Sequence, residues 1–437
     1  MYKYYSRSMK LHKTYEMTER NQSLSWKDIF LCYPIFDNIC SHLDPVDILC
    51  FRLTTKKLSP FFESLFKTQW NINRQLTRYV KDPVSFRSLL AKHDALISGA
   101  FAREIWHDSE LSLDIFVDSL SPFRTCDPLD KYLMGCEGYE LQSVQPWSSN
   151  TLHLYAGPVA PISELKSFAY QVQIKTYHRR SSTKAKAIQV RIIYTIGIPL
   201  MAIFHVFRRS FVVNIISWNF GYSLFPDVSY IKRTAHCSNG GRNPNSEVNG
   251  KTEHLKRRYR SRTWTWKEAV ARGGIKKLHS LQLNSRRRIG DSYTWSIALD
   301  TNGVKAGQPT SILQHSFFKV EKYIDSRDYL VRVEIFRSPV LRYEYTTSHK
   351  VYHDPRAFWV LVEQKLAELT NAELSKIPED ERPAFLGTNR PTFERASQLN
   401  WTFYDDQVPI WYEQYLKDEA ERVRIIKKKA REGWGDI

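Results

Sequence analysis

The stretch that decides the fold is ALISGAFAREIWHDSELSLDIFV, residues 95–117. Its first part, 95–98, is short and apolar and leads directly into Gly99, a pattern that predicts a buried strand followed by a tight turn. Residues 100–106 favour a helix, and a polar loop then separates that helix from a second apolar strand at 113–117. Strands and helices in this mixture predict an α+β protein.

The chain beyond this stretch supports the same fold class. The apolar run 192–207 is interrupted by glycine, proline and histidine, so it indicates a buried strand followed by a helix rather than a membrane span. Alternation of apolar and polar residues predicts antiparallel strands at 293–298, 317–323, 329–336 and 341–346. Residues 358–369 and 410–430 have helical periodicity. No repeat of solenoid length is present.

The segment before the deciding stretch is helical and strongly apolar. Ile35, Phe36, Ile39, Cys40 and Leu43 form one stripe on a short helix. Asp-Pro at 44–45 and Ser-Pro at 59–60 each supply a capping side chain and a proline at the first helical position, so two more short helices follow. Such short helices expose more apolar surface than they can bury among themselves, and we expect a partner or the next domain to cover it.

These patterns divide the chain into five parts. We predict an N-terminal flexible tail, a helical segment, an α/β domain, a basic linker or long loop, and a C-terminal α+β region rich in strands. Their boundaries are 1–25, 26–80, 84–230, 231–290 and 291–437.

Positive charge is concentrated in the linker. The chain has 64 Lys and Arg against 46 Asp and Glu, a net charge of +18, and residues 231–290 hold 16 of the former and 3 of the latter, a local charge of +13. Such a stretch could bind phosphate backbones, could act as a nuclear-import signal, or could be a solvated linker. The candidate nucleic-acid contacts are Arg257, Arg258, Arg286, Arg287 and Arg288.

The helical segment resembles the F-box. In that family Leu-Pro precedes an apolar helix, Leu-Asp-Pro-x-Asp-Leu-Leu follows, and a Leu/Arg-rich helix ends the motif. The resemblance covers about a tenth of the chain, and Tyr33 stands where the family usually has Leu. The residues that match are Pro34, Ile39, Leu43, Asp44-Pro45, Asp47-Ile48-Leu49, Leu53 and Leu58-Ser59-Pro60.

The F-box resemblance implies a partner and a role. F-box proteins dock on the Skp-type adaptor of a cullin-RING ubiquitin ligase while the rest of the chain holds a protein substrate. The alternative is that the segment is a plain helical cap on an α/β domain. The adaptor-binding residues that the resemblance implies are Pro34, Ile39, Leu43, Pro45, Leu49 and Leu53.

The deciding stretch resembles the opening of the nucleotidyltransferase fold. That fold carries Gly-Ser after its first strand and Asp-x-Asp on its second, and residues 188–226 also resemble the group, so the two matches span roughly half the chain. The arrangement of an F-box-like segment followed by a nucleotidyltransferase-like domain resembles that of uncharacterised fungal proteins. An active site would use Asp114 and Gly99.

The carboxylates needed for catalysis are incomplete in the sequence. Two acids two residues apart on a strand share a face and can clamp metal ions, but Ser112 replaces the first of them. Asp118 shares the face of Asp114, yet four residues of strand put it about 13 Å away. The strand expected to carry a third acid offers Gln189 and Arg191. We therefore expect a scaffold without catalysis and without a metal or cofactor. Asp114 would then serve as a capping or ion-pairing acid.

Motifs that the sequence lacks indicate the cellular compartment of the protein and argue against several common enzyme classes. The six cysteines show no C-x-x-C pair, which indicates reduced, buried thiols, and the first 25 residues have no apolar signal core, so we expect a cytoplasmic or nuclear protein with no membrane partner. G-x-S-x-G, P-loop and H-E-x-x-H motifs are also missing.

The sequence as a whole predicts a non-enzymatic, substrate-recruiting subunit of an SCF-type ubiquitin ligase. It would bind a Skp-type adaptor and an unknown protein substrate. The alternatives are an active Mg-dependent nucleotidyltransferase and a basic nucleic-acid-binding protein.

Overall fold

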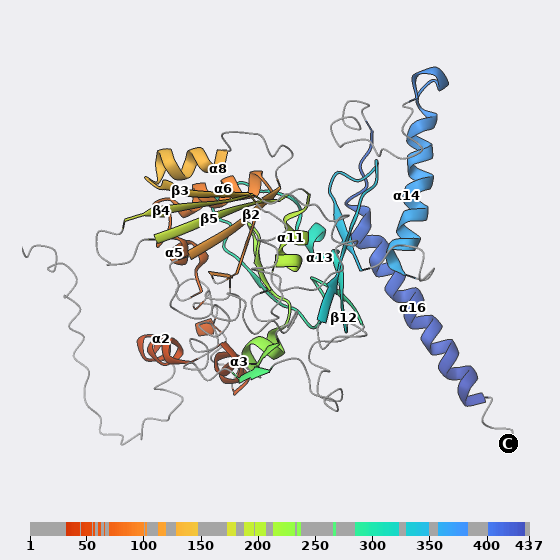
Figure 1. The fold of residues 1–437 in the computed structure, drawn as a ribbon. Coiled ribbons are helices and arrows are strands. Elements are labelled where there is room, and N and C mark those ends of the chain that lie inside the picture. The colour runs from red at the N-terminus through yellow and green to blue at the C-terminus, as the bar shows by residue number, and fades with distance from the viewer. Residues whose placement is uncertain are drawn as a thin grey trace, which may run out of the picture. The chain divides into compact units, whose positions relative to one another are not determined.

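The computed structural model describes two compact units, Met1–Leu65 and Phe66–Ile437, which we treat separately (Figure 1). The described residues are 32–43, 45–54, 56, 60–62, 65, 70–99, 101–102, 112–118, 128–146, 173–180, 188–195, 197–206, 213–231, 234–236, 265–267, 285–322, 329–348, 357–382 and 401–432.

The α-helices within these ranges are α2 (Tyr33–His42), α3 (Pro45–Thr54), α5 (Ile72–Leu76), α6 (Pro83–Lys92), α8 (Pro128–Lys131), α11 (Pro199–Val206), α13 (Thr310–Gln314), α14 (Phe358–Ser375) and α16 (Gln407–Glu432). Two π-helical turns, Tyr132–Cys136 and Asp227–Ile231, and a 3₁₀ turn, Glu379–Glu381, are also described.

The strands are β1 (Leu96–Ser98), β2 (Ser112–Asp118), β3 (Glu140–Pro146), β4 (Gln173–Arg179), β5 (Ile188–Thr195), β6 (Asn214–Ile216), β7 (Phe220–Ser223), β8 (Thr234–His236), β9 (Thr265–Lys267), β10 (Arg286–Arg288), β11 (Trp295–Ala298), β12 (Phe317–Lys322), β13 (Tyr329–Arg332), β14 (Glu334–Phe336) and β15 (Tyr345–Thr347).

The first unit is helical and holds an aromatic core. α2 has a proline in its first turn, where the missing N–H costs nothing, and its buried Phe36 packs edge-on against Phe62 with ring centroids 5.0 Å apart. Phe51 of α3 stacks on the same Phe36 ring at 5.8 Å. Residues 60–62 are helical, at the position where the sequence predicts a third helix.

The second unit is built on an eight-stranded sheet in the order β11-β7-β6-β1-β2-β5-β4-β3. β2 and β5 run parallel, and the other neighbouring pairs described in this sheet are antiparallel. The α+β prediction is therefore confirmed. The parallel pair is the feature that matters for the site, because it puts residues of β5 directly beside the acidic face of β2.

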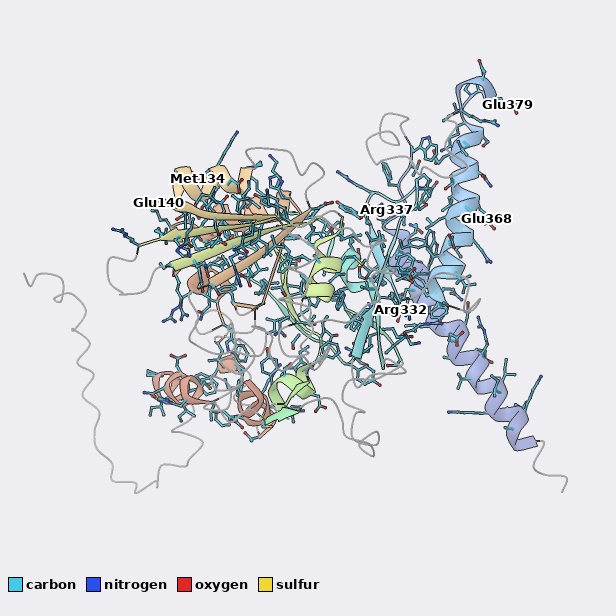
Figure 2. The ribbon with its side chains drawn as sticks, in the orientation of Figure 1. Met134, Glu140, Arg332, Arg337, Glu368 and Glu379 are labelled. Atoms are coloured by element: carbon cyan, nitrogen blue, oxygen red, sulfur yellow. The ribbon has the colours of Figure 1, made fainter. Side chains whose placement is uncertain are left out.

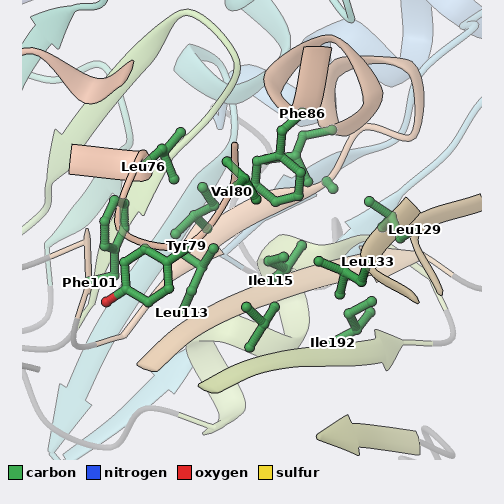
Figure 3. Close-up of a cluster of buried hydrophobic side chains, with 14 of the residues drawn as sticks. Leu76, Tyr79, Val80, Phe86, Phe101, Leu113, Ile115, Leu129, Leu133 and Ile192 are labelled. Atoms are coloured by element: carbon green, nitrogen blue, oxygen red, sulfur yellow. The ribbon is translucent and has the colours of Figure 1, made fainter. Parts of the chain in front are cut away.

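One face of this sheet is covered by short helices. Leu113 and Ile115 of β2 and Ile192 of β5 project to that side and pack with Phe86 of α6 and Leu133 of the π-helical turn (Figure 3). α6 begins where it does because the Asp82 side chain accepts hydrogen bonds from two backbone N–H groups of the first turn, at 3.1 Å each.

The opposite face is half apolar and half polar. Its apolar half, with Phe116 and Ile193, packs against Ile203 and Phe204 of α11 and against Phe318 of β12. A further core joins α14 to the start of α16 and to β14 and β15. The polar half of the face is the candidate site described below.

Two predicted boundaries are wrong. Residues 70–80 do not belong to the helical segment, because Ile72, Leu76 and Tyr79 are buried in the core of the sheet unit. The predicted region 291–437 is not separate from the α/β domain either, since β11 completes its sheet. Of the predicted basic linker or long loop 231–290, residues 286–288 form β10, which pairs with β12, and most of the rest lies outside the described residues.

Two findings bear on the environment of the chain. None of the helices in the described part is long and apolar enough to cross a membrane. Of the cysteines described, Cys32, Cys40, Cys50 and Cys136 are free thiols, and only Cys40 is buried, so the expected burial of the thiols is wrong for the other three. Burial raises the pKa of Cys40 to about 11.

Candidate functional site

Polar side chains gather on one face of the central strands. Ser98 of β1 is in register with Asp114 of β2, and Asp114 is in register with Arg191 of β5. Because alternate residues of a strand share a face, Ser112 and Gln189 lie on the same side. The strand order thus brings together the acid of the deciding stretch and the two residues that stand where a third carboxylate was expected.

Asp114 and Arg191 form a bidentate ion pair. Nε of Arg191 donates to one carboxylate oxygen and an Nη donates to the other, both at 2.6 Å. Asp114 is buried. Fork-to-fork pairs of this kind are among the strongest hydrogen-bonded contacts in proteins, because both partners are charged and planar. The ion-pairing role expected for Asp114 is present in the structure.

The pair changes what this face can do chemically. Both oxygens of Asp114 already accept a hydrogen bond from Arg191, and the positive charge of its guanidinium opposes the binding of a divalent cation beside it. In the described ranges there is no group of three His, Cys, Asp or Glu side chains that could hold a metal ion. Beside the pair, Nε2 of Gln189 lies 2.9 Å from Nε2 of His178.

The second acid of this strand is used structurally. Asp118 accepts a hydrogen bond from the backbone N–H of Gly197 at 2.9 Å. Burial raises its pKa above the ordinary value. Asp118 therefore fixes the turn after β5, and it does not extend the polar face toward a metal site.

The sequence predicts a tight turn at Gly99, and the backbone conformation there explains why the residue is a glycine. It has φ = 80°, in the left-handed region that glycine adopts without strain. The hydroxyl of the preceding Ser98 is buried and donates to the carbonyl oxygen of Asn214 at 2.6 Å, so it is not directed at a ligand.

The predicted adaptor-binding residues lie on α2, at its C-cap Leu43 and on α3. Pro34 is exposed, and Ile39 and Leu43 are half-buried. Ile35, which shares their stripe, is 41% exposed. Pro45, Leu49 and Leu53 belong to α3, but their side chains lie outside the described residues. The first helix thus presents an apolar edge beside its buried residues Phe36 and Cys40.

The predicted nucleic-acid contacts are partly wrong. Arg287 is only 2% exposed and pairs with Asp291 at 2.5 Å, so it cannot reach a phosphate. Arg288 is half-buried, donates to the carbonyl oxygen of Gln314 and lies over the Tyr412 ring at 4.6 Å. Arg286 is exposed. Arg257 and Arg258 lie outside the described residues.

A second polar cluster was not predicted. Asp130 of α8 is buried and accepts hydrogen bonds from the hydroxyls of Tyr177 and Tyr194, both at 2.6 Å, and from the ammonium of Lys175. The partners are 45 to 64 residues away in the chain, so no local pattern could reveal them. The cluster anchors α8 on β4 and β5.

Comparisons with protein-family models, curated proteins and solved structures find no match for this chain.

Proposed function

We propose that this chain is a non-catalytic, protein-binding subunit of an SCF-type cullin-RING ubiquitin ligase. The helical unit docks on a Skp-type adaptor, and the second unit, with a nucleotidyltransferase-like core, holds a protein substrate. Such a subunit works in the cytoplasm or the nucleus, where free thiols such as Cys32 and Cys50 stay reduced.

The observation that carries the proposal is the apolar edge of α2. Ile35 is substantially exposed, and Ile39 follows it four residues later on the same side of the helix, with the half-buried Leu43 directly after the helix end. They lie next to Phe36, which is fully buried. A helix that has already filled its own core and still shows an apolar edge suits docking into a hydrophobic groove of another protein.

The polar face of the second unit supports the non-catalytic part. Arg191 neutralises Asp114 and engages both of its oxygens, and Ser112 replaces the acid that a nucleotidyltransferase needs two residues earlier. The same face therefore has the geometry of a structural ion pair. We infer that the fold is kept as a scaffold for binding protein.

Co-purification tests the adaptor contact. The unchanged full chain should retain a Skp-type adaptor, and the double variant Ile35→Asp with Ile39→Asp should lose it, because two carboxylates cannot enter an apolar groove. Lys56→Asp is the matched control, since it adds a carboxylate at an exposed position of the same unit outside the stripe. No association of the unchanged chain, or equal retention by the double variant, contradicts the proposal.

Two further assays address the alternative functions. Nucleotide incorporation with Mg²⁺ that disappears in Asp114→Ala would show an active nucleotidyltransferase. Salt-dependent nucleic-acid binding that is lost on neutralising Arg257 and Arg258 would show a nucleic-acid-binding protein. We expect neither.

A further inference from the structure

The last helix of the chain changes character along its length. The first turns of α16 belong to the core: Val408 is fully buried, and Trp411, Tyr412 and Tyr415 pack partly buried against it. From Leu416 onward the described side chains are exposed or half-buried (Figure 2). The helix continues for about four further turns, along which the described side chains up to Ala430 are not buried.

Large apolar side chains continue into this exposed part. Leu416 is 48%, Val423 46% and Ile426 62% exposed. Together with Glu419 and Ala430, they recur at alternating steps of three and four residues, the spacing of a coiled-coil seam. We call Leu416, Glu419, Val423, Ile426 and Ala430 the α16 seam.

Charge is divided sharply along the same helix. Residues 413–421 contain Glu413, Asp418, Glu419 and Glu421 with one cation, Lys417, for a net charge of −3. Residues 422–431 contain six Lys or Arg and no acid, for a net charge of +6. The helix therefore has an acidic half and a basic half, each about three turns long.

We propose that the α16 seam pairs, in the antiparallel direction, with the same seam of a second copy of this chain. With residue 421 at the centre, Leu416 of one copy lies opposite Ile426 of the other, and Glu419 lies opposite Val423. The two-fold symmetry repeats both pairs, so that Leu416 and Ile426 of each copy meet an apolar partner, while Ala430 lies beyond this overlap.

Charge complementarity selects this occupant and this direction. Antiparallel pairing places the acidic half of each copy against the basic half of the other, whereas parallel pairing would place six cations beside six cations. Glu419 is compatible with the seam, because its carboxylate already pairs with Arg422 of the same helix at 2.7 Å. An anionic membrane or nucleic acid would attract only the basic half and would repel the acidic one.

The expected dimer is weak. The overlap from Leu416 to Ile426 is about 15 Å of helix, which is shorter than the overlap of stable two-stranded coiled coils. Its interface falls in the size class of transient complexes, so we expect dissociation constants in the micromolar range that rise with salt.

Sedimentation equilibrium of the full chain tests the pairing. The unchanged chain should form dimers reversibly, and Ile426→Asp should weaken dimerisation at least tenfold. Ile425→Asp is the matched control: Ile425 is 45% exposed but lies outside the seam, so this variant should dimerise as the unchanged chain does. Equal monomer content in all three proteins, or equal loss in both variants, overturns the proposal.

Cross-linking tests the direction of pairing. The double variant Leu416→Cys with Ile426→Cys should form intermolecular disulfides, because the two positions face each other between copies, and Leu416→Cys alone should form no more than the unchanged chain. Cross-linking of the single variant would show parallel pairing and would contradict the proposal. Binding of anionic vesicles or nucleic acid through α16 by a strictly monomeric chain would overturn it as well.

Discussion

The ion pair between Asp114 and Arg191 has a predictable cost of removal. Arg191→Met leaves the Asp114 carboxylate, which is 4% exposed, without its cation. Removing one partner of a fully buried pair costs about 3–5 kcal/mol. The Arg191 side chain is 28% exposed, so solvent screens part of the attraction, and we reduce the expected loss to about 2–3 kcal/mol.

This loss of stability corresponds to a measurable shift in melting temperature. Unfolding entropy is about 2.1 cal/mol/K per residue, so a unit of about 370 residues loses about 0.8 kcal/mol per degree. Arg191→Met should therefore lower the Tm of Phe66–Ile437 by about 3–4 °C in differential scanning calorimetry of the full chain. Combining it with Asp114→Asn should recover at least about 1 kcal/mol relative to the sum of the single variants.

Two results would refute the reasoning about this pair. Strict additivity of the two substitutions would mean that the side chains do not stabilise each other. A rise in Tm for Asp114→Asn, together with a Mg²⁺-induced rise in the unchanged chain that the variant lacks, would mean that Asp114 is a metal ligand in a strained site.

Three further predictions concern stability. Burial lowers the pKa of His315 to about 4, so the folded state binds the proton less readily than the unfolded chain. The stability should therefore fall as the pH drops from about 6.5 toward 4. His315→Asn should flatten this dependence when the Tm is measured as a function of pH. Asp130→Ala should cost about 3–5 kcal/mol by chemical denaturation, because it leaves the Lys175 ammonium buried without its carboxylate. Gly307→Ala should lower the Tm more than Gly221→Ala, because its new Cβ would lie 2.6 Å from a backbone oxygen of α6, whereas nothing lies within 4 Å at Gly221.

Each of these has a contradicting result. A pH profile that is the same with and without His315 would show that its protonation is not linked to unfolding. An unchanged free energy of unfolding after Asp130→Ala would mean that the buried Lys175 finds another partner or loses its charge. Equal Tm values for Gly307→Ala and Gly221→Ala would mean that the chain moves away from α6 at no cost.

Periodicity in the sequence located most of the elements. Apolar runs of strand length predicted β1 and β2 close to their observed bounds, and helical spacing predicted α14 and α16. These signals are local, because the side-chain pattern of a strand or helix depends on which side faces a core. The predicted end of the helical segment was wrong for α5, because local periodicity does not show that its two apolar residues, Ile72 and Leu76, pack against the sheet.

The candidate site could not be predicted, because it depends on strand pairing that the local sequence pattern does not show. Asp114 and Arg191 meet because β2 and β5 are parallel neighbours, 77 residues apart in the chain. Arg287 was wrongly predicted to contact nucleic acid. In a run of three arginines, strand alternation buries the middle one against Phe225 and Phe318. A count of charges cannot distinguish it from its neighbours.

The docking of the helical unit on a Skp-type adaptor is the central claim, and direct binding of purified proteins tests it. Titration calorimetry of the full chain with the adaptor should show one adaptor per chain with a micromolar or tighter dissociation constant. Ile35→Asp with Ile39→Asp should abolish the heat of binding while the Tm of Phe66–Ile437 stays unchanged. No binding by the unchanged chain at about 100 µM, or equal affinity of the double variant, would contradict the account.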